Sequence, residues 1–120
     1  MLTSVLQVAL GGAVGSVLRF LAFQIVPAPW GTMAVNVLGS FLIGLLFVPA
    51  ARLGLSVLLL TGVLGGFTTF SAFSLDAALM WNGGRPVLAF VYVAGSVLMS
   101  LVAVAAGAGL FQILQERVWQ

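Results

Sequence analysis

The strongest constraint on the fold of this chain is that long apolar stretches, separated only by short turns, fill almost all of it. Hydrophobic residues make up 62% of the 120 residues, and charged residues only 5%. A soluble domain carries about 25% charged residues, so a surface of this composition belongs in lipid. Because a helix crosses a bilayer with about 20 apolar residues, the chain has room for four spans without a soluble domain. We therefore expect an all-α membrane protein.

Prolines set the limits of these spans. We expect four helices in a single membrane domain, 1–120, over residues 4–25, 31–48, 55–81 and 87–111. Proline cannot continue a helix ladder, so Pro27 and Pro29 end the first span and Pro49 ends the second. Pro86 is well placed to begin the fourth span. Met1–Gln7 carries no basic side chain, so we expect a retained helix here rather than a secretory signal.

A polar interruption lies inside the third apolar stretch. Residues Gly65–Phe73 contain two glycines, two threonines and a serine among three phenylalanines and an alanine. Such residues weaken a helix, and hydrocarbon offers no water to the backbone groups that a break sets free. A break at this depth is stable only inside protein or beside a polar pathway. We therefore expect a break in the third span, with a role in permeation or ion binding.

The same segment combines groups that favour a cation with groups that favour an anion. Unwound carbonyls from Gly65 to Thr68 resemble the backbone cation sites of broken membrane helices. The edge of a phenyl ring is positive, so Phe70 and Phe73, which share a helical face, can hold an anion without a formal charge. Neighbouring hydroxyl groups can donate hydrogen bonds to that anion. They belong to Thr68, Thr69 and Ser71.

Two polar stripes run along the second and fourth spans. Each is spaced i, i+4, i+8, so its members lie on one face of a helix. The stripes are Thr32, Asn36 and Ser40, and Tyr92, Ser96 and Ser100. Serine and threonine often bond only to their own backbone, but the amide of Asn36 has more donors and acceptors than its own helix can satisfy. We expect Asn36 to meet another polar group, water or an ion.

The charged residues near these elements are few. Arg19 lies within the first span, where a charge is costly and is usually paired or functional. Its alternative is a structural role, in which it extends toward the lipid interface or caps carbonyl groups. Asp76 follows the polar break, where it either sits at the mouth of a pathway or pairs with an arginine.

The positions of the arginines say almost nothing about the orientation of the chain in the membrane. With four spans, Arg52 and Arg117 lie on one side, and Arg85 lies on the other together with Arg19 if that side chain extends outward. The positive-inside rule then sets two charges against two. Either a partner determines the orientation, or the chain inserts both ways and pairs antiparallel with itself.

Small residues at four-residue spacing predict close packing between helices. The pairs are Gly11 with Gly15, Gly12 with Ser16, Gly62 with Gly66, and Ala103 with Gly107. For most of these glycines, tight packing alone is a sufficient explanation.

The chain lacks the residue types of most catalytic centres. It has no cysteine, histidine or lysine, and its two acids, Asp76 and Glu116, are far apart in sequence. Serine and threonine then have no general base, and no phosphate-binding glycine loop is present. We therefore expect a protein that is not an enzyme. Four arginines are too few for a nucleic-acid partner.

Taken together, these residues resemble the Fluc (CrcB) fluoride channels of microbes. The resemblance covers essentially the whole chain and rests on Gly11–Gly15 followed by Arg19, on Asn36–Ser40, and on Gly65–Phe73. It implies a fluoride-selective channel that passively exports fluoride across the bacterial inner membrane and relieves fluoride toxicity. It also implies an antiparallel, dual-topology homodimer with two fluoride pores.

The resemblance also implies roles for the polar residues. Phe70 and Phe73 would form a phenylalanine box, and Asn36 would line the pore with Thr32 one turn before it. Other matches to polar positions along the fluoride pathway are Thr69, Ser71, Tyr92, Ser96 and Ser100.

A structural sodium ion at the dimer interface is implied as well. Its ligands would be the backbone carbonyls of Gly65 and Thr68 from both subunits. Two positions depart from the family pattern, since Ala72 replaces a common threonine and Asp76 replaces a common glutamate. The first departure removes a hydroxyl, and the second shortens the reach of an acid.

Two other functions fit a chain of this size. A proton-coupled small multidrug exporter also has four spans and often dual topology, but it needs a carboxylate in its first helix. Residues 4–25 contain none. A non-conducting membrane assembly protein would explain the glycines, but neither Asn36 nor the polar break.

Overall fold

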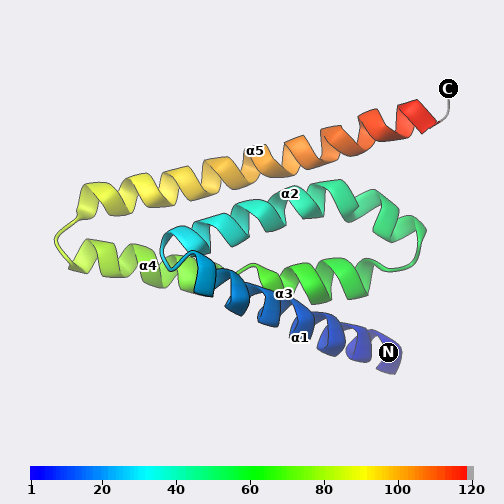
Figure 1. Ribbon diagram of the computed structural model, residues 1–120, viewed down its shortest axis with the longest axis horizontal. Coiled ribbons are helices and arrows are strands. Elements are labelled where there is room, and N and C mark those ends of the chain that lie inside the picture. The colour runs from blue at the N-terminus through cyan, green and yellow to red at the C-terminus, as the bar shows by residue number, and fades with distance from the viewer. Residues whose placement is uncertain (119–120) are drawn as a thin grey trace.

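Helices make up nearly all of residues 1–118, the part of the chain that the computed structural model describes. They are α1 (Leu2–Ile25), α2 (Trp30–Arg52), η1 (Val57–Leu64), α3 (Gly65–Phe67), α4 (Phe70–Asn82) and α5 (Pro86–Val118) (Figure 1). Four segments are long and apolar enough to cross a membrane: Leu2–Ile25, Trp30–Arg52, Val57–Asn82 and Pro86–Arg117. The prediction of an all-helical protein with four such helices is confirmed.

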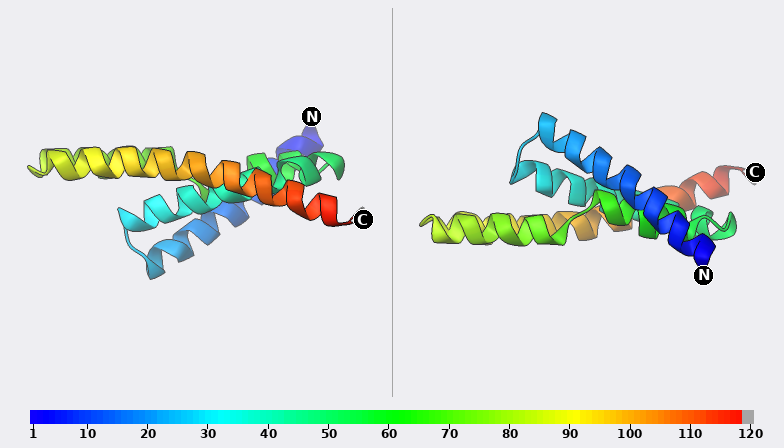
Figure 2. Two further views of the ribbon diagram at one scale, coloured as in Figure 1. Left: turned by 90° about the horizontal axis from the view of Figure 1, so that it is seen from above. Right: turned by 90° about the horizontal axis from the view of Figure 1, so that it is seen from below.

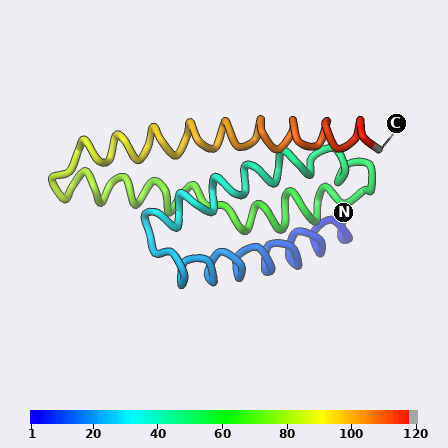
Figure 3. The backbone as a smooth tube through the Cα atoms, turned by 45° about the horizontal axis from the view of Figure 1, so that its top comes forward, coloured from blue at the N-terminus to red at the C-terminus, as the bar shows by residue number. Residues whose placement is uncertain are grey.

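The helices run back and forth along the long axis of the molecule, which measures 54 Å. The N-terminus, the α2–η1 turn and the end of α5 lie at one end, and the α4–α5 turn lies at the other (Figures 1 and 3). The α1–α2 turn stops short of the α4–α5 turn, and the two hairpins diverge there (Figure 2). Part of the α4–α5 hairpin is therefore uncovered in the single chain.

Glycine allows α1 to lie directly on the third span. A Cβ atom added at Gly66 would lie 2.6 Å from the carbonyl oxygen of Gly12, and one added at Gly15 would overlap the carbonyl of Val63. On the other side of the bundle, α5 meets α2 through glycine in the same way, since a Cβ atom at Gly107 would overlap a carbonyl of α2. The close packing predicted from the four-residue spacing is confirmed.

Two helix ends differ from the expectation. The second helix does not stop at Pro49 but continues to Arg52. Proline there removes a single backbone hydrogen bond, and the last turn still closes because Leu53 N–H donates to the Pro49 carbonyl at 3.1 Å. The fourth helix continues past Phe111 to Val118, because the intervening residues include neither glycine nor proline. Pro86 begins that helix, as predicted.

The third span consists of three helical pieces. In η1 the bonding reaches five residues back, so that Gly65 N–H donates to the carbonyl of Leu60. Gly65–Phe67 forms one α-helical turn, and Thr68 and Thr69 are then extended, with φ, ψ of −82°, 158° and −152°, 111°.

The expectation of an unwound backbone from Gly65 to Thr68 is therefore wrong for Gly65–Phe67, which stays helical. Gly66 in this turn serves close contact with α1 rather than a change of backbone conformation. The extended residues are the two threonines, whose branched side chains favour this backbone.

Candidate ion pathway

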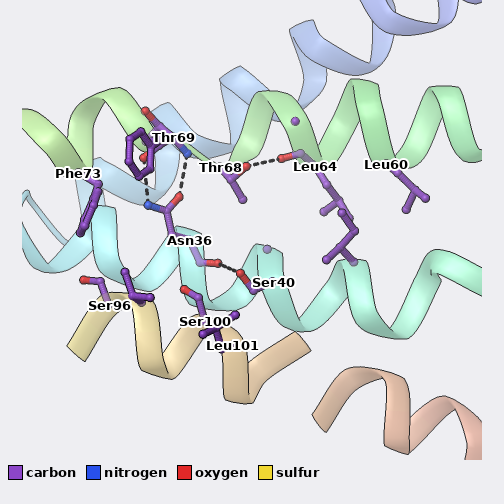
Figure 4. A pocket seen from close by; sticks show the side chains of 15 residues that line it. Asn36, Ser40, Leu60, Leu64, Thr68, Thr69, Phe73, Ser96, Ser100 and Leu101 are labelled. Carbon is purple, nitrogen blue, oxygen red and sulfur yellow. Dashed lines mark hydrogen bonds between the residues drawn. The ribbon is translucent and has the colours of Figure 1, made fainter. Parts of the chain in front are cut away.

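An open cavity of about 390 Å³ lies between α2, the extended threonines and α5. Its lining combines polar groups with two phenyl rings (Figure 4). The residues of the predicted sites that line it are Asn36, Gly65, Thr68, Thr69, Phe70, Phe73, Ser96 and Ser100. The structure thus brings together residues from three separate spans. Five predicted residues lie outside this lining, namely Arg19, Thr32, Ser71, Asp76 and Tyr92.

Asn36 bonds twice to one residue of the extended segment. Its Oδ1 accepts a hydrogen bond from Thr69 N–H at 2.7 Å, and its Nδ2 donates to the Thr69 carbonyl at 3.0 Å. Figure 4 shows this side chain reaching from α2 to the extended segment. The polar partner expected for Asn36 is therefore the backbone of Thr69. One hydrogen of the Asn36 amide remains beyond these two bonds, at a residue that lines the cavity.

The same bonds release two backbone carbonyls. In a continuous helix, Thr69 N–H would donate to the Gly65 carbonyl, and Ala72 N–H to the Thr68 carbonyl. Here Thr69 N–H donates to Asn36, and Ala72 N–H donates to Thr69 Oγ1 at 3.2 Å, which caps α4. The carbonyls of Gly65 and Thr68 therefore lose their helical donors. Of the two, the Thr68 carbonyl accepts from Arg19 Nη1 at 3.1 Å.

The hydroxyl groups near the cavity differ in whether they have a hydrogen left to donate to a ligand. Thr68 Oγ1 donates to the Leu64 carbonyl at 2.9 Å, so its hydrogen is used within its own helix. The prediction that it can donate to an anion is therefore wrong in this conformation. Thr69 Oγ1 and Ser71 Oγ lie 3.2 Å apart. One hydrogen serves that bond, and the other hydroxyl hydrogen of the pair remains free.

Two buried hydroxyl groups have no hydrogen-bond partner within residues 1–118. They are Thr32 Oγ1 and Ser96 Oγ, whose residues are 0% and 4% exposed. An unsatisfied buried group of this kind costs about 1–3 kcal/mol, so each is well suited to bind a water molecule or an ion. Ser96 lines the cavity, and Ser100 lies one turn further along the same face of α5 (Figure 4).

A chain of aromatic rings forms one end of the site. The ring centres of Phe70 and Phe73 are 5.4 Å apart, and those of Phe73 and Tyr92 are 5.6 Å apart. Phe73 is 8% exposed, whereas Phe70 is 77% exposed in the single chain. The Tyr92 hydroxyl donates to Asp76 Oδ2 at 3.2 Å. The shorter acid at position 76 therefore reaches Tyr92, and it pairs with this hydroxyl rather than with an arginine.

One residue that positions the site was not assigned a role from the sequence. A Cβ atom at Gly39 would overlap the Thr68 side chain, so glycine allows α2 to approach the extended segment. The available signal was its spacing, since Gly39 follows Asn36 by three residues and shares its helical face. For Arg19, the alternative that it caps carbonyl groups is confirmed by its bond to the Thr68 carbonyl. Which carbonyl it meets could not be predicted, because nothing in the sequence relates these two positions.

Comparison of the sequence with known proteins relates the chain to a family of membrane proteins. A family model described as "CrcB-like protein, Camphor Resistance (CrcB)" matches residues 6–108. A protein of Rhizobium etli (strain CIAT 652) named "Fluoride-specific ion channel FluC" is 49% identical over 118 residues, which cover 89% of this chain and 94% of the relative.

Two further relatives carry the same name. One from Paracoccus denitrificans (strain Pd 1222) is 51% identical over 110 residues, with 85% of this chain and 89% of the relative covered. One from Cereibacter sphaeroides (strain ATCC 17029 / ATH 2.4.9) is 51% identical over 115 residues, with 89% and 93% covered.

Proposed function

The chain belongs to the CrcB family, and we propose that it is a fluoride-selective channel through which fluoride leaves the cell passively. The relatives that resemble it over nearly their whole length are named fluoride channels. The observation that carries the proposal is the cavity in which an asparagine amide lies near phenyl rings and free hydroxyls. A channel converts no substrate, so the protein is not an enzyme.

Asn36 is the residue to which we assign the central contact with fluoride. Its two bonds to Thr69 fix the amide group, so its remaining Nδ2 hydrogen keeps a constant direction. Fluoride gives up strongly bound water on entering a narrow pathway, and donors of fixed direction compensate for that loss. The positive edge of Phe73 and the hydroxyls of Ser96 and Ser100 continue the pathway along the same cavity.

We assign the remaining predicted residues to positions beside the pathway or at its mouth. Thr69 and Ser71 share one hydrogen bond and keep one free hydroxyl hydrogen, which we assign to fluoride. We assign Thr32, with its unpaired Oγ1, to a water molecule or to fluoride. Tyr92 and Asp76 form a hydrogen-bonded pair, to which we assign the mouth of the pathway.

We further propose that two copies of the chain pair antiparallel in the bacterial inner membrane. Two features support this arrangement. The cavity is open in the single chain, and Phe70 beside it is 77% exposed. An antiparallel partner would close the cavity of each chain and place its own phenyl rings against it. The single membrane domain of residues 1–120 would then contribute to two pores.

A structural sodium ion between the two copies belongs to the same proposal. The carbonyls of Gly65 and Thr68 are the candidate ligands, because both have lost their helical donors and carbonyl oxygens at broken helices bind Na⁺. The Thr68 carbonyl also accepts from Arg19 Nη1 and has one further lone pair for an ion. Gly65 is exposed in the single chain, as a carbonyl shared with a partner needs to be. When bound, the ion supplies positive charge beside a pathway for anions.

Fluoride efflux from proteoliposomes tests the proposed function. Vesicles that contain potassium fluoride and the purified protein are expected to release fluoride once valinomycin lets potassium leave with it. Vesicles that contain potassium chloride are expected to retain chloride. Protein-free vesicles are the control. Fluoride release equal to that control, or equal release of chloride, would contradict the proposal.

A further inference from the structure

A single peptide group in the extended segment is held from both sides by polar side chains. Arg19 Nη1 donates to the Thr68 carbonyl oxygen at 3.1 Å. The N–H of the same peptide group, which belongs to Thr69, donates to Asn36 Oδ1 at 2.7 Å. Arg19, the peptide group and the Asn36 amide therefore form one continuous chain of hydrogen bonds, which we name the Arg19–Asn36 relay. It ends at the cavity.

The position of Arg19 follows from the glycine contacts of α1. Gly11, Gly15 and Arg19 are spaced by four residues, so they lie on one face of the helix. Gly11 and Gly15 face backbone atoms of η1 and α3 too closely for a side chain to fit between them. The next position on that face is Arg19, which is half-buried and reaches the residue where the third span becomes extended.

A guanidinium group at this position acts on the peptide group electrically. The carbonyls at the end of a helix carry partial negative charge, and a cation there is favourable. A charged donor on the Thr68 carbonyl also polarises its peptide group, which makes Thr69 N–H a stronger donor. In a chain of hydrogen bonds such polarisation strengthens each member by roughly 10–30%. The amide of Asn36 lies next in this chain, and its remaining hydrogen becomes a better donor.

We propose that Arg19 is a positioning residue of the anion pathway, which acts on Asn36 through the peptide group between Thr68 and Thr69. The inference rests on the proposed function for the identity of the anion. It assigns to an arginine within the membrane the task of orienting and polarising the amide that meets fluoride. A role limited to packing or to solubility in the interface would leave the Asn36 amide unchanged.

Nuclear magnetic resonance of the full chain can observe this amide directly. Asn36 and Asn82 are the only asparagines, so labelling with ¹⁵N-asparagine gives two side-chain NH₂ groups, with one pair of signals each. Asn82, at the end of α4, serves as an internal reference. We compare the wild type with Arg19→Gln, Arg19→Lys and the control Arg85→Gln. Arg85 is exposed in the α4–α5 turn, far from the extended segment (Figure 1).

Arg19→Gln is expected to shift both Asn36 side-chain signals and to speed their hydrogen exchange by about tenfold, while Asn82 is unchanged. Its fluoride efflux is expected to fall by about tenfold, which corresponds to one strong hydrogen bond. Arg19→Lys keeps the charge and can still donate a hydrogen bond to the Thr68 carbonyl, so it is expected to shift the signals less and to retain more efflux. Arg85→Gln is expected to leave the Asn36 signals and the efflux unchanged.

The relay is disproved if the Asn36 signals of a folded Arg19→Gln protein coincide with those of the wild type, or if Arg85→Gln moves them equally. If Arg19→Gln does not fold, Arg19→Lys decides the question by the presence or absence of the smaller shift. These signals are recorded without a fluoride gradient. The relay can therefore fail while wild-type vesicles conduct fluoride, and it can hold while they do not.

Discussion

At the scale of single residues, the site depends on side chains that form the hydrogen bonds which a continuous helix would form within its own backbone. Asn36 binds the N–H and the carbonyl of Thr69, which no helical neighbour satisfies. Thr69 in turn caps α4 with its own hydroxyl. Ser40 differs from both, since its hydroxyl donates to the Asn36 carbonyl of its own helix at 2.7 Å. Neighbouring polar residues of one stripe therefore have unequal importance.

Asn36→Ala is expected to lower fluoride efflux by at least about tenfold. It leaves two backbone groups of Thr69 unpaired at about 1–3 kcal/mol each, and it removes the remaining amide hydrogen of a residue that lines the cavity. Ser40→Ala is the matched control on the same face, and it is expected to conduct like the wild type. Efflux from proteoliposomes with equal amounts of folded protein measures both. Equal loss in the two variants would show that the stripe matters only as a whole.

At the scale of elements, the contact between α1 and the third span positions the extended segment. Gly15 lies against backbone atoms of that span, whereas a Cβ atom at Gly12 would meet nothing within 4 Å. The two glycines are thus unlike in structure although they are alike in sequence. Glycine at position 15 permits the contact between α1 and the third span, whereas position 12 has room for a larger side chain.

Gly15→Ala is therefore expected to destabilise the protein by about 1–3 kcal/mol, because the backbone of α1 must move away from Val63. Gly12→Ala is expected to be neutral or slightly stabilising, since alanine favours a helix. Thermal unfolding in detergent, followed by the loss of the folded peak in size-exclusion chromatography, measures the difference. A Gly12→Ala protein as unstable as Gly15→Ala would contradict the packing described above.

At the scale of the whole molecule, the candidate site lies open at the surface of the single chain. The cavity is open, and the α4–α5 hairpin extends beyond the other two spans (Figure 2). These features fit a molecule completed by an inverted copy of itself, as we propose.

Added charge is expected to test this pairing. Leu53 lies in the α2–η1 turn and Asn82 at the end of α4, and these two places are at opposite ends of the molecule (Figure 1). Leu53→Arg and Asn82→Arg each add one arginine at one end, so each is expected to force one orientation. Cells that express either variant alone should lose fluoride resistance, and cells that express both should regain it. A variant that is uniformly oriented by terminal tagging and still protects cells would rule out obligatory antiparallel pairing.

Removal of sodium is expected to lower the stability of the assembled molecule. A ligand that binds only the folded state contributes about 2.7 kcal/mol when its concentration is a hundred times its dissociation constant. Thermal unfolding in sodium chloride is compared with unfolding in equal potassium chloride after exhaustive dialysis. A higher midpoint in sodium supports the site at Gly65 and Thr68, and equal midpoints across the sodium series oppose it.

Much of the architecture was predictable because it depends on local properties. The lack of charge requires a membrane environment, and Pro27, Pro29 and Pro86 limit helices wherever they occur. The expectation that Pro49 ends the second helix is wrong, because a proline in the last turn of a helix removes only one backbone hydrogen bond. The need of Asn36 for a partner was equally visible, since a buried amide cannot satisfy itself.

By itself, then, the sequence determined that this protein has four membrane-spanning helices and polar residues on two of their faces. Only the tertiary structure decided that Thr68 and Thr69 are the extended residues, and that Asn36 and Arg19 hold one peptide group between them. These partners are 33 and 49 residues apart. Periodicity predicts which face of a helix carries the polar residues. What that face contacts depends on the approach of another helix, which Gly15 and Gly39 permit here.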